Sequence, residues 1–494
     1  MHNLYFTCRK LTRRAALSPP AGSNAKIMAK LKLRGKQLQK IGYPEGKLIG
    51  LAINVAYEHF RREPQEWVLN MLQQVLAHPE SFRTVAGWER IAQVILNEQS
   101  EAAANKPFEL AKNAREFPIY GDEQIEIGAK DQMYTAMRLP ITVQGALMPD
   151  AHQGYGLPIG GVLATENSVI PYGVGVDIGC RMCLSIYALP PQLLVGEKDK
   201  FKHLLGEHTR FGFEAFERPM DDPIFSRDEF KYVKVARDNR DKAYQQIGSS
   251  GGGNHFVEFG IANITAADNG MNLPLGEYLA VLSHSGSRGM GANIAKHYTE
   301  VAMKTCRLPK EARHLAWLTL DSEAGHEYWA AMTLAGDYAA ACHDHIHRRL
   351  AKALGEKPLA RIENHHNFAW KEHLADGREV IVHRKGATPA GKGVLGIIPG
   401  SMTAPGFIVR GKGNFASLQS ASHGAGRLMS RSAAKKSLTQ SEVSKHLADH
   451  GIHLIGGGID EAPMAYKDIH TVMANQTELV EVLGAFYPRM VRMA

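Results

Sequence analysis

His423 lies in the segment 420–427, where serine, alanine and glycine surround it and Arg427 and Arg431 follow. The pattern predicts a helix over 428–436, and two arginines one turn apart near a helix N-terminus favour a bound phosphate. An imidazole beside a phosphate can attack phosphorus and form a phosphoramidate, which is the covalent route open to histidine. For any single histidine, the alternative is a purely structural role.

Asp177 and Cys180 lie three residues apart, with Gly179 between them. A carboxylate and a thiolate at this spacing can hold one metal ion, and this mixture of hard and soft ligands suits Mn, Fe, Co or Zn better than Mg alone. Taken by themselves, they are more often a buried cysteine beside a capping aspartate. His255 follows the glycine-rich run 248–253, whose successive N–H groups could bind an anion.

Further polar residues stand on glycine-flanked segments. Asp150 and His152 could face one cleft, or form an Asx turn with a surface histidine. His284 follows the strand-like run 279–282, and Arg288 is placed to bind a phosphate through two hydrogen bonds. Because a structural core does not need so many histidines on glycine-rich loops, these segments together predict a metal site beside a phosphate site.

The elements that must position these residues fall into two parts. Residues 25–105 are predicted to form a helical region, because apolar residues recur at helical spacing, and 98–106 reads as a linker. From residue 117 to 494, short β-branched runs, glycine-rich turns and helical stretches predict an α+β domain. The expected strands include 380–383, 397–398 and 407–409, and the expected helices include 328–354 and 478–483. Neither a Rossmann motif nor a P-loop is present.

The bulk properties favour a polyanionic partner. The chain has 494 residues, a formal net charge of +8 and a pI of about 9.0, a balance typical of proteins that bind nucleic acid or nucleotides. Residues 1–24 are predicted to be a disordered basic tail. The five cysteines suggest no disulfide framework, which fits a reducing compartment. No apolar run reaches the length of a membrane span, and we expect a cytoplasmic protein.

Taken together, these segments resemble the RtcB family of GTP-dependent RNA ligases, over residues 117–494. That family has a distinctive α+β fold, unlike that of the lysine-nucleotidylating ligases, whose KxDG element is missing here. The motifs that carry the resemblance are, in order, MPDAHQGYGLPIG, VGVDIGC, GGGNHFVE, HSGSRG, HHN, RKGAT, PGSM, SHGAGRLMSR and DEAPMAYKDI.

The resemblance implies a set of functional residues. His423 would be the nucleophile that carries GMP, and Cys180 would bridge two Mn²⁺ ions. His366 is preferred over His365 as a metal ligand because Asn367 follows it directly. The implied metal ligands are Asp177, Cys180, His255, His284 and His366. The implied nucleotide contacts are Asn254, Glu258, Asn367, Ser401, Gly424, Ala425, Gly426 and Arg427, and the implied phosphate or RNA contacts are Arg288, Arg431 and Lys385.

The implied reaction joins RNA ends that carry a 2′,3′-cyclic phosphate or 3′-phosphate to 5′-hydroxyl ends, in RNA repair or tRNA splicing. Arg181 departs from the family, which usually has glycine there. The family typically ends in Lys-Gly, and here Arg492 either replaces that lysine or guanine selectivity is altered. The helical region, which compact members lack, is a candidate contact for RNA or an accessory protein.

Two alternatives to an RNA ligase stay open at this point. The chain could be a metal-dependent phosphoesterase that heals RNA ends without joining them. It could also be a non-catalytic RNA-binding or docking protein in which the helical region is the working part.

Overall fold

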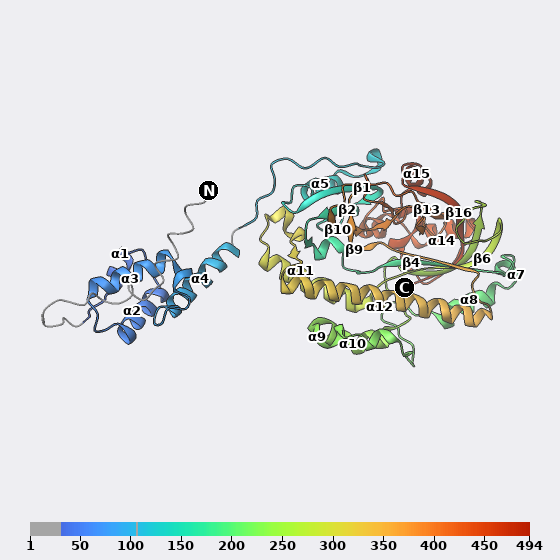
Figure 1. The fold of residues 1–494 in the computed structure, drawn as a ribbon. Coiled ribbons are helices and arrows are strands. Elements are labelled where there is room, and N and C mark those ends of the chain that lie inside the picture. The colour runs from blue at the N-terminus through green and yellow to red at the C-terminus, as the bar shows by residue number, and fades with distance from the viewer. Residues whose placement is uncertain (1–30, 105–106) are drawn as a thin grey trace, which may run out of the picture. The chain divides into compact units, whose positions relative to one another are not determined.

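The computed structural model describes residues 31–104 and 107–494 (Figure 1). The chain divides into two compact units, 1–106 and 107–494. The predicted basic tail, 1–24, lies outside the described residues. Within the described ranges, no helix combines the length and apolar character needed to span a bilayer.

The N-terminal unit is helical in its described part, as the sequence predicts. Apolar residues at helical spacing turn inward from each helix and form one buried cluster around Leu38, Val55, Leu72 and Ile91. The last helix runs on to Ala104, so 98–104 is helical rather than the predicted linker, as its alanine and glutamate content favours. The helices are α1 (Gly35–Lys40), α2 (Lys47–His59), α3 (Gln65–Ala77) and α4 (Glu89–Ala104).

Trp88 is the largest side chain in this cluster, and its ring stacks on Phe60 with centroids 4.1 Å apart. We expect Trp88→Ala to remove about 3–5 kcal/mol of stability, which is close to the whole stability of a unit this small. The N-terminal unit should therefore lose its helical circular dichroism and become sensitive to protease. Glu66→Ala, an exposed position on α3, serves as the control. A Trp88→Ala chain as protease-resistant as the control would contradict the prediction.

The second unit is an α+β domain, as the sequence predicts, built on two main sheets. The larger sheet has the strand order β12-β13-β16-β5-β6-β4-β8, with β15 beside β16. The smaller sheet has the order β1-β2-β10-β9. The strands of the larger sheet are β4 (Arg181–Tyr187), β5 (Phe256–Ile264), β6 (Gly276–Ser285), β8 (Ala360–His365), β12 (Leu395–Ile398), β13 (Gly406–Gly411), β15 (His453–Ile455) and β16 (Val480–Met493).

The remaining strands are short or belong to the smaller sheet. That sheet contains β1 (Thr142–His152), β2 (Ile159–Thr165), β9 (Asn367–His373) and β10 (Glu379–Lys385). Two pairs stand apart: β3 (Ser168–Val169) with β7 (Leu318–Thr319), and β11 (Ala387–Pro389) with β14 (Ser420–Ser422). The turn at His366 joins β8 of the larger sheet to β9 of the smaller one, so the two sheets meet there.

The long helix α12 (Glu323–Leu354) packs on β4 and β6 of the larger sheet, and Figure 1 shows it running along the domain. It begins at a Ser322 cap and ends at Gly355, which takes a left-handed conformation. The other helices are α5 (Ile127–Ala136), α6 (Pro171–Val174), α7 (Leu193–Gly196), α8 (Lys198–His208), α9 (Glu229–Tyr232), α10 (Lys234–Gln246), α11 (Arg288–Thr305), α13 (Arg431–Ser437), α14 (Gln440–Asp449) and α15 (Ile469–Ala474).

Two predicted helices are placed wrongly. Residues 478–483 lead into β16, which pairs with β13 on one side and β5 on the other; this pairing overrides the local helical pattern. The helix expected over 428–436 begins only at Arg431, where Ser430 caps its N-terminus. His423 follows β14 and is therefore not at a helix N-terminus, so that argument for a phosphate beside it fails.

Candidate active site

Four neighbouring strands bring the predicted metal ligands together. Cys180 directly precedes β4, His255 directly precedes β5, His284 lies on β6 and His366 directly follows β8. Because these neighbouring strands are antiparallel, the starts of β4 and β5 lie beside the ends of β6 and β8. Asp177 stands in the turn before Cys180, and its Oδ1 accepts a hydrogen bond from the backbone N–H of residue 287.

The ligand atoms lie within reach of a shared ion. Cys180 Sγ is 3.4 Å from His255 Nε2 and 3.1 Å from His284 Nε2. His284 Nε2 is also 3.2 Å from His366 Nε2, and His255 Nε2 is 2.9 Å from Asp177 Oδ2. The structure thus brings all five predicted ligands into one cluster.

The cluster is chemically suited to a divalent cation. His284 Nδ1 is 3.0 Å from the carbonyl oxygen of Asn254, which can only accept, so Nδ1 carries the proton and the Nε2 lone pair faces Cys180 and His366. Burial lowers the pKa of His284 to about 3, so its imidazole is neutral. Burial, reinforced by Asp177, raises the pKa of the Cys180 thiol well above its usual value, and a bound cation would offset that cost. Converging lone pairs on imidazoles, a carboxylate and a thiol match a transition-metal site.

Asp150, for which no specific role was predicted, forms hydrogen bonds with the predicted nucleophile His423. Its Oδ2 lies 2.7 Å from His423 Nδ1 and accepts hydrogen bonds from the backbone N–H groups of His423 (3.1 Å) and Gly424 (3.3 Å). Although burial alone would raise the pKa of Asp150, His423 holds it below its usual value. Since the carboxylate accepts a hydrogen bond from Nδ1–H, the proton of the ring stays on Nδ1 and His423 keeps a lone pair on Nε2. The ring centroids of His423 and His366 are 4.9 Å apart, so the nucleophile borders the metal cluster.

The close approach of β1 to the loop after His423 requires glycine at position 426. A Cβ there would lie 2.0 Å from the carbonyl oxygen of Asp150, and Gly426 has φ +72°. Lys467 also binds β1, because its Nζ donates to the carbonyl oxygens of Pro149 (3.2 Å) and Ala151 (2.7 Å). The residues on either side of Asp150 are thus held as well.

A cavity of about 300 Å³ opens beside His423 and the metal cluster. Glu258 lines this cavity and is buried, and burial raises the pKa of its carboxyl well above the usual value, which favours the neutral form. The predicted nucleotide and phosphate contacts that line the cavity are Asn254, Glu258, Ser401, Gly424, Ala425, Gly426, Arg427 and Arg431.

Three predicted contact residues lie outside this lining. Asn367 donates to the carbonyl oxygen of Asp177 (3.2 Å) and accepts from the backbone N–H of residue 386. Arg288 Nη2 donates to the Gly212 carbonyl oxygen at 2.5 Å. Lys385 Nζ donates to the carbonyl oxygen of Tyr155 at 2.5 Å. Their roles toward nucleotide and RNA stay predictions.

The two arginines that follow His423 are paired with carboxylates. Arg427 Nη1 is 3.1 Å from Glu461 Oε2, and Arg431 Nη1 is 2.9 Å from Asp460 Oδ2. Arg431 also contacts Glu461. A phosphate at these guanidinium groups would therefore compete with Asp460 and Glu461.

Arg492 points away from the nucleotide cavity. Its Nη1 donates to the carbonyl oxygens of Leu205 (2.7 Å) and Gly206 (2.6 Å), while its neighbour Met493 lines the cavity. Successive side chains on a strand face opposite sides, and on β16 the cavity side falls to Met493. The idea that Arg492 replaces the family's lysine is therefore wrong.

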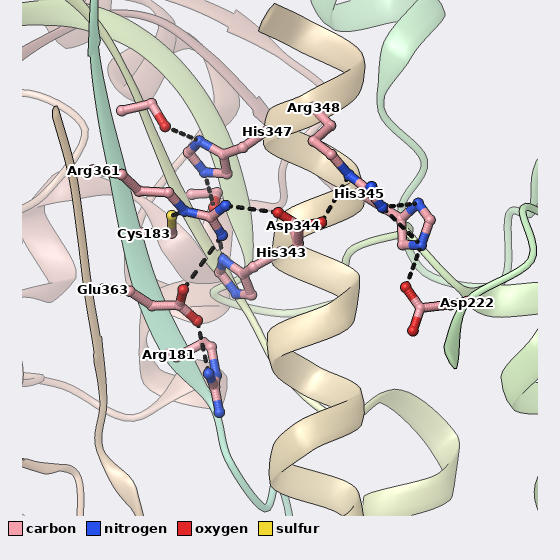
Figure 2. A network of polar contacts seen from close by, with 12 residues as sticks. Arg181, Cys183, Asp222, His343, Asp344, His345, His347, Arg348, Arg361 and Glu363 are labelled. Atoms are coloured by element: carbon pink, nitrogen blue, oxygen red, sulfur yellow. Dashed lines mark hydrogen bonds and ion pairs between the residues drawn. The ribbon is translucent and has the colours of Figure 1, made fainter. Parts of the chain in front are cut away.

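A buried chain of hydrogen bonds joins α12 to β4 and β6 (Figure 2). His343 Nε2 donates to the carbonyl oxygen of Ser285 (3.1 Å), so its Nδ1 accepts from the Ser283 hydroxyl (2.9 Å). That hydroxyl accepts from His347 Nε2 (2.8 Å), and His347 Nδ1 accepts from Ser185 (2.7 Å). Since Ser285 follows a predicted metal ligand, the chain ties α12 to β4 and β6 directly beneath the metal cluster.

Cys183 lies close enough to His343 and His347 to form a second group of metal-ligand types. Here, however, the hydrogen-bond chain uses every ring nitrogen, and Arg361 Nε donates to Cys183 Sγ at 3.0 Å. Burial and the positive charge of Arg181 keep the pKa of His343 well below its usual value. Two neighbouring guanidinium groups would repel a cation, so we assign this group a structural role.

Arg181, the departure from the family glycine, is buried and forms an ion pair with Glu363 (2.7 Å). It also donates to the carbonyl oxygens of Gly336 (2.8 Å) and Gly179 (3.1 Å). These contacts direct the guanidinium toward α12, and the ion pair with Glu363 neutralises its added positive charge.

We expect Glu363→Gln to lower the free energy of unfolding of the catalytic unit by about 2 kcal/mol, because it leaves the buried Arg181 charge without its counter-ion. The value is at the low end for buried pairs because the Glu363 side chain is 27 % exposed. Urea unfolding followed by fluorescence measures the effect. Asp344→Asn, at a more exposed partner of Arg361, is the control. Equal stability of the two variants would refute a special role for the Arg181 pair.

Comparison with known proteins shows the family to which the chain belongs. The family model described as tRNA-splicing ligase RtcB matches residues 132–222 and 214–493. An RNA-splicing ligase RtcB1 from Escherichia coli is 35% identical over 391 residues, covering 73% of this chain and 92% of that protein. The RNA-splicing ligase RtcB of Escherichia coli strain K12 is 34% identical over 389 residues, with the same coverage. A tRNA-splicing ligase RtcB from Archaeoglobus fulgidus is 30% identical over 417 residues, covering 69% of this chain and 86% of that protein. The chain belongs to the RtcB family.

Proposed function

We propose that this protein is an RNA ligase that joins 2′,3′-cyclic phosphate or 3′-phosphate ends to 5′-hydroxyl ends, using GTP and Mn²⁺. One observation carries the proposal: His423, held by Asp150 through Nδ1, keeps its Nε2 lone pair beside both the metal cluster and a nucleotide-sized cavity. A phosphoesterase needs metal and water, but it does not need a nucleophilic histidine at this junction.

Asp177, Cys180, His255, His284 and His366 would together hold the metal ions. Among them, Cys180 Sγ lies close to both His255 and His284. When bound, Mn²⁺ supplies positive charge that offsets the charge developing on a reacting phosphate.

In the first chemical step, His423 Nε2 attacks the α-phosphorus of GTP. A phosphorus–nitrogen bond forms, the bond to the β-phosphate oxygen breaks, and pyrophosphate leaves with the electron pair. Asp150 accepts the Nδ1 hydrogen bond throughout and stabilises the positive charge that appears on the ring. The neutral Glu258 carboxyl and Ser401 offer hydrogen bonds inside the cavity to the nucleotide.

The later steps use the RNA ends. Water opens a cyclic phosphate to a 3′-phosphate, whose oxygen attacks the phosphorus of GMP and releases His423. The 5′-hydroxyl oxygen then attacks the 3′-phosphate, loses its proton and displaces GMP. Arg288, Arg431 and Lys385 would hold the phosphates of the two ends.

We further propose that residues 117–494 form the catalytic domain and that the protein acts in cytoplasmic RNA repair or tRNA splicing. The N-terminal helical region would contact RNA or an accessory protein. Its exposed cations Lys32, Arg34, Lys36 and Lys40 support an RNA contact.

A metal-dependent phosphoesterase that heals RNA ends is the second candidate function. It is favoured by the carboxylate pairing of Arg427 and Arg431, which leaves fewer free cations for a nucleotide triphosphate. This candidate converts cyclic phosphate ends without GTP and without joining them.

The decisive test is incubation of the full chain with α-labelled GTP and Mn²⁺, followed by denaturing gel electrophoresis. We expect an acid-labile protein–GMP adduct. The same incubation with labelled ATP, CTP and UTP measures the guanine selectivity, which we expect to be altered because Arg492 does not replace the family's lysine. We also expect that a 3′-phosphate RNA and a 5′-hydroxyl RNA become one product. Conversion of cyclic phosphate ends with no adduct and no joined product would replace the proposal by the phosphoesterase.

A further inference from the structure

We propose that Tyr155, Tyr172 and His314 form an aromatic corner that binds a base of the RNA substrate next to the reacting end. The inference rests on the proposed RNA ligase activity and names a part of the substrate-binding site for which no role is predicted above, although Tyr155 itself lies in the motif MPDAHQGYGLPIG.

Three separate segments build this corner. Tyr155 lies in the turn between β1 and β2, Tyr172 lies on α6, and His314 lies in the short 3₁₀ helix Lys310–Leu315. The rings of Tyr172 and His314 stack with centroids 5.2 Å apart and an interplanar angle of 28°. Tyr155 meets both nearly edge-on, at 70° to Tyr172 and 73° to His314. The rings of Tyr172 and His314 are therefore nearly parallel, and the ring of Tyr155 stands nearly perpendicular to both.

The three rings of the corner are accessible to solvent, unlike aromatic side chains in a hydrophobic core, which are covered. Tyr155 is 68 % exposed, and Tyr172 and His314 are half-buried. A ring held this open gains little from packing within the protein, whereas a nucleobase stacked on it would bury the exposed face of the ring. Stacking of a base on aromatic rings tolerates any sequence, as joining unrelated RNA ends requires.

Basic side chains lie beside the corner, although burial lowers the pKa of Lys385 to about 7. Lys385 Nζ lies 5.0 Å from the centre of the Tyr172 ring and donates to the carbonyl oxygen of Tyr155. The pKa of His314 is lowered by burial and by the positive charges of Arg313 and Lys385. Aromatic faces interleaved with cations suit a nucleotide, whose base can stack while its phosphate pairs with lysine or arginine.

The corner also lies beside the reacting groups. Lys385 precedes Gly386, at which a Cβ would lie 3.2 Å from His423 Cε1. A Cβ at Gly175 would meet both Lys385 and Asn367 at 3.8 Å, and Asn367 bonds to the backbone of Asp177. An RNA strand whose end lies at His423 would therefore place a nearby base over the corner.

The test measures binding of a fluorescent RNA with a 3′-phosphate end to the full chain, by anisotropy and without GTP. We expect Tyr155→Leu to raise the dissociation constant about tenfold, the size of one lost base stack, and Tyr155→Phe to change it less than twofold. Tyr232→Leu, at a 57 % exposed tyrosine on α9, is the matched control and should bind as the wild type does.

An abasic nucleotide identifies what the corner holds. In one RNA the abasic nucleotide is placed next to the 3′-phosphate, and in a second RNA it is placed next to the 5′-hydroxyl. At one of these two positions it should raise the dissociation constant of the wild type about tenfold. It should not raise the dissociation constant of Tyr155→Leu any further. Equal dissociation constants for wild type and Tyr155→Leu, or equal abasic losses in both, would overturn the inference.

The two proposals fail in different ways. Formation of the GMP adduct uses no RNA, so Tyr155→Leu should form it at the wild-type rate, which also shows that the variant is folded. If wild type forms the adduct and joins RNA while Tyr155→Leu binds RNA normally, only the aromatic corner is wrong. If wild type forms no adduct, the ligase proposal fails, while the RNA binding measurement still decides the corner.

Discussion

Asp150→Asn should slow formation of the His423–GMP adduct by between about a hundredfold and about 10⁴-fold, the larger value being the loss seen when the aspartate of a serine-protease triad becomes an amide. Asp150 Oδ2 accepts three N–H hydrogen bonds, including one from His423 Nδ1. An asparagine has no negative charge to stabilise the ring as it becomes cationic, and its amide N–H₂ can hold the imidazole in the wrong tautomer. The measurement is the single-turnover rate of labelling with α-labelled GTP.

Two comparisons make this result specific. His423→Ala should form no adduct at all, which sets the floor of the assay. The metal content of Asp150→Asn should equal that of wild type, because Asp150 contacts His423 and not the ligand cluster. Wild-type labelling by Asp150→Asn would show that the Nδ1 contact does not prepare the nucleophile.

Cys180→Ala should abolish both tight Mn²⁺ binding and adduct formation. Cys180 Sγ is the one ligand atom close to both His255 and His284, so its loss separates the cluster into two incomplete halves. Loss of a bridging thiolate removes a charged ligand from each half, and the buried imidazoles that remain bind a cation weakly. Metal content after gel filtration and the labelling rate are measured together.

Cys183→Ala is the matched control for this prediction. Cys183 is also buried and lies on β4, three residues after Cys180, but its sulfur accepts a hydrogen bond from Arg361. Its removal should leave the metal content unchanged. After treatment with EDTA, added Mn²⁺ should restore labelling in wild type and Cys183→Ala, but not in Cys180→Ala. Metal loss in Cys183→Ala alone would mean that the second cysteine–histidine group, and not the first, holds the ion.

The sequence identified the chemistry of the site better than its geometry. Asp177 and Cys180 stand out because a carboxylate and a thiol three residues apart on a glycine-rich turn are rarely needed by a core. Their convergence with His284 and His366 depends on which strands are neighbours, and strand order cannot be read from local patterns. The α+β class was predictable because helical and strand-like runs alternate along the chain.

The features that the sequence missed depend on contacts between distant residues. Asp150 meets His423 across 273 positions of the chain, so its spacing from His152 says nothing about its real partner. Residues 478–483 look helical locally, but the segment from Val480 onward forms β16, because it pairs with β13 and then also with β5. The direction of Arg492 follows from the alternation of side chains on β16, which is defined only once the register with β5 is known.

The strand order of the larger sheet also governs how the enzyme comes into being. Neighbouring strands come from distant parts of the chain: Val257 on β5 pairs with Arg492 on β16, and Arg181 on β4 pairs with His365 on β8. Non-local pairs form late, because the entropy of closing a long loop is lost before any contact repays it. The ligand cluster draws on four of these strands, so a half-made or misfolded chain presents scattered imidazoles and thiols rather than a metal centre. Activity therefore depends on complete folding, since only a chain that has paired its distant strands correctly can begin to modify RNA.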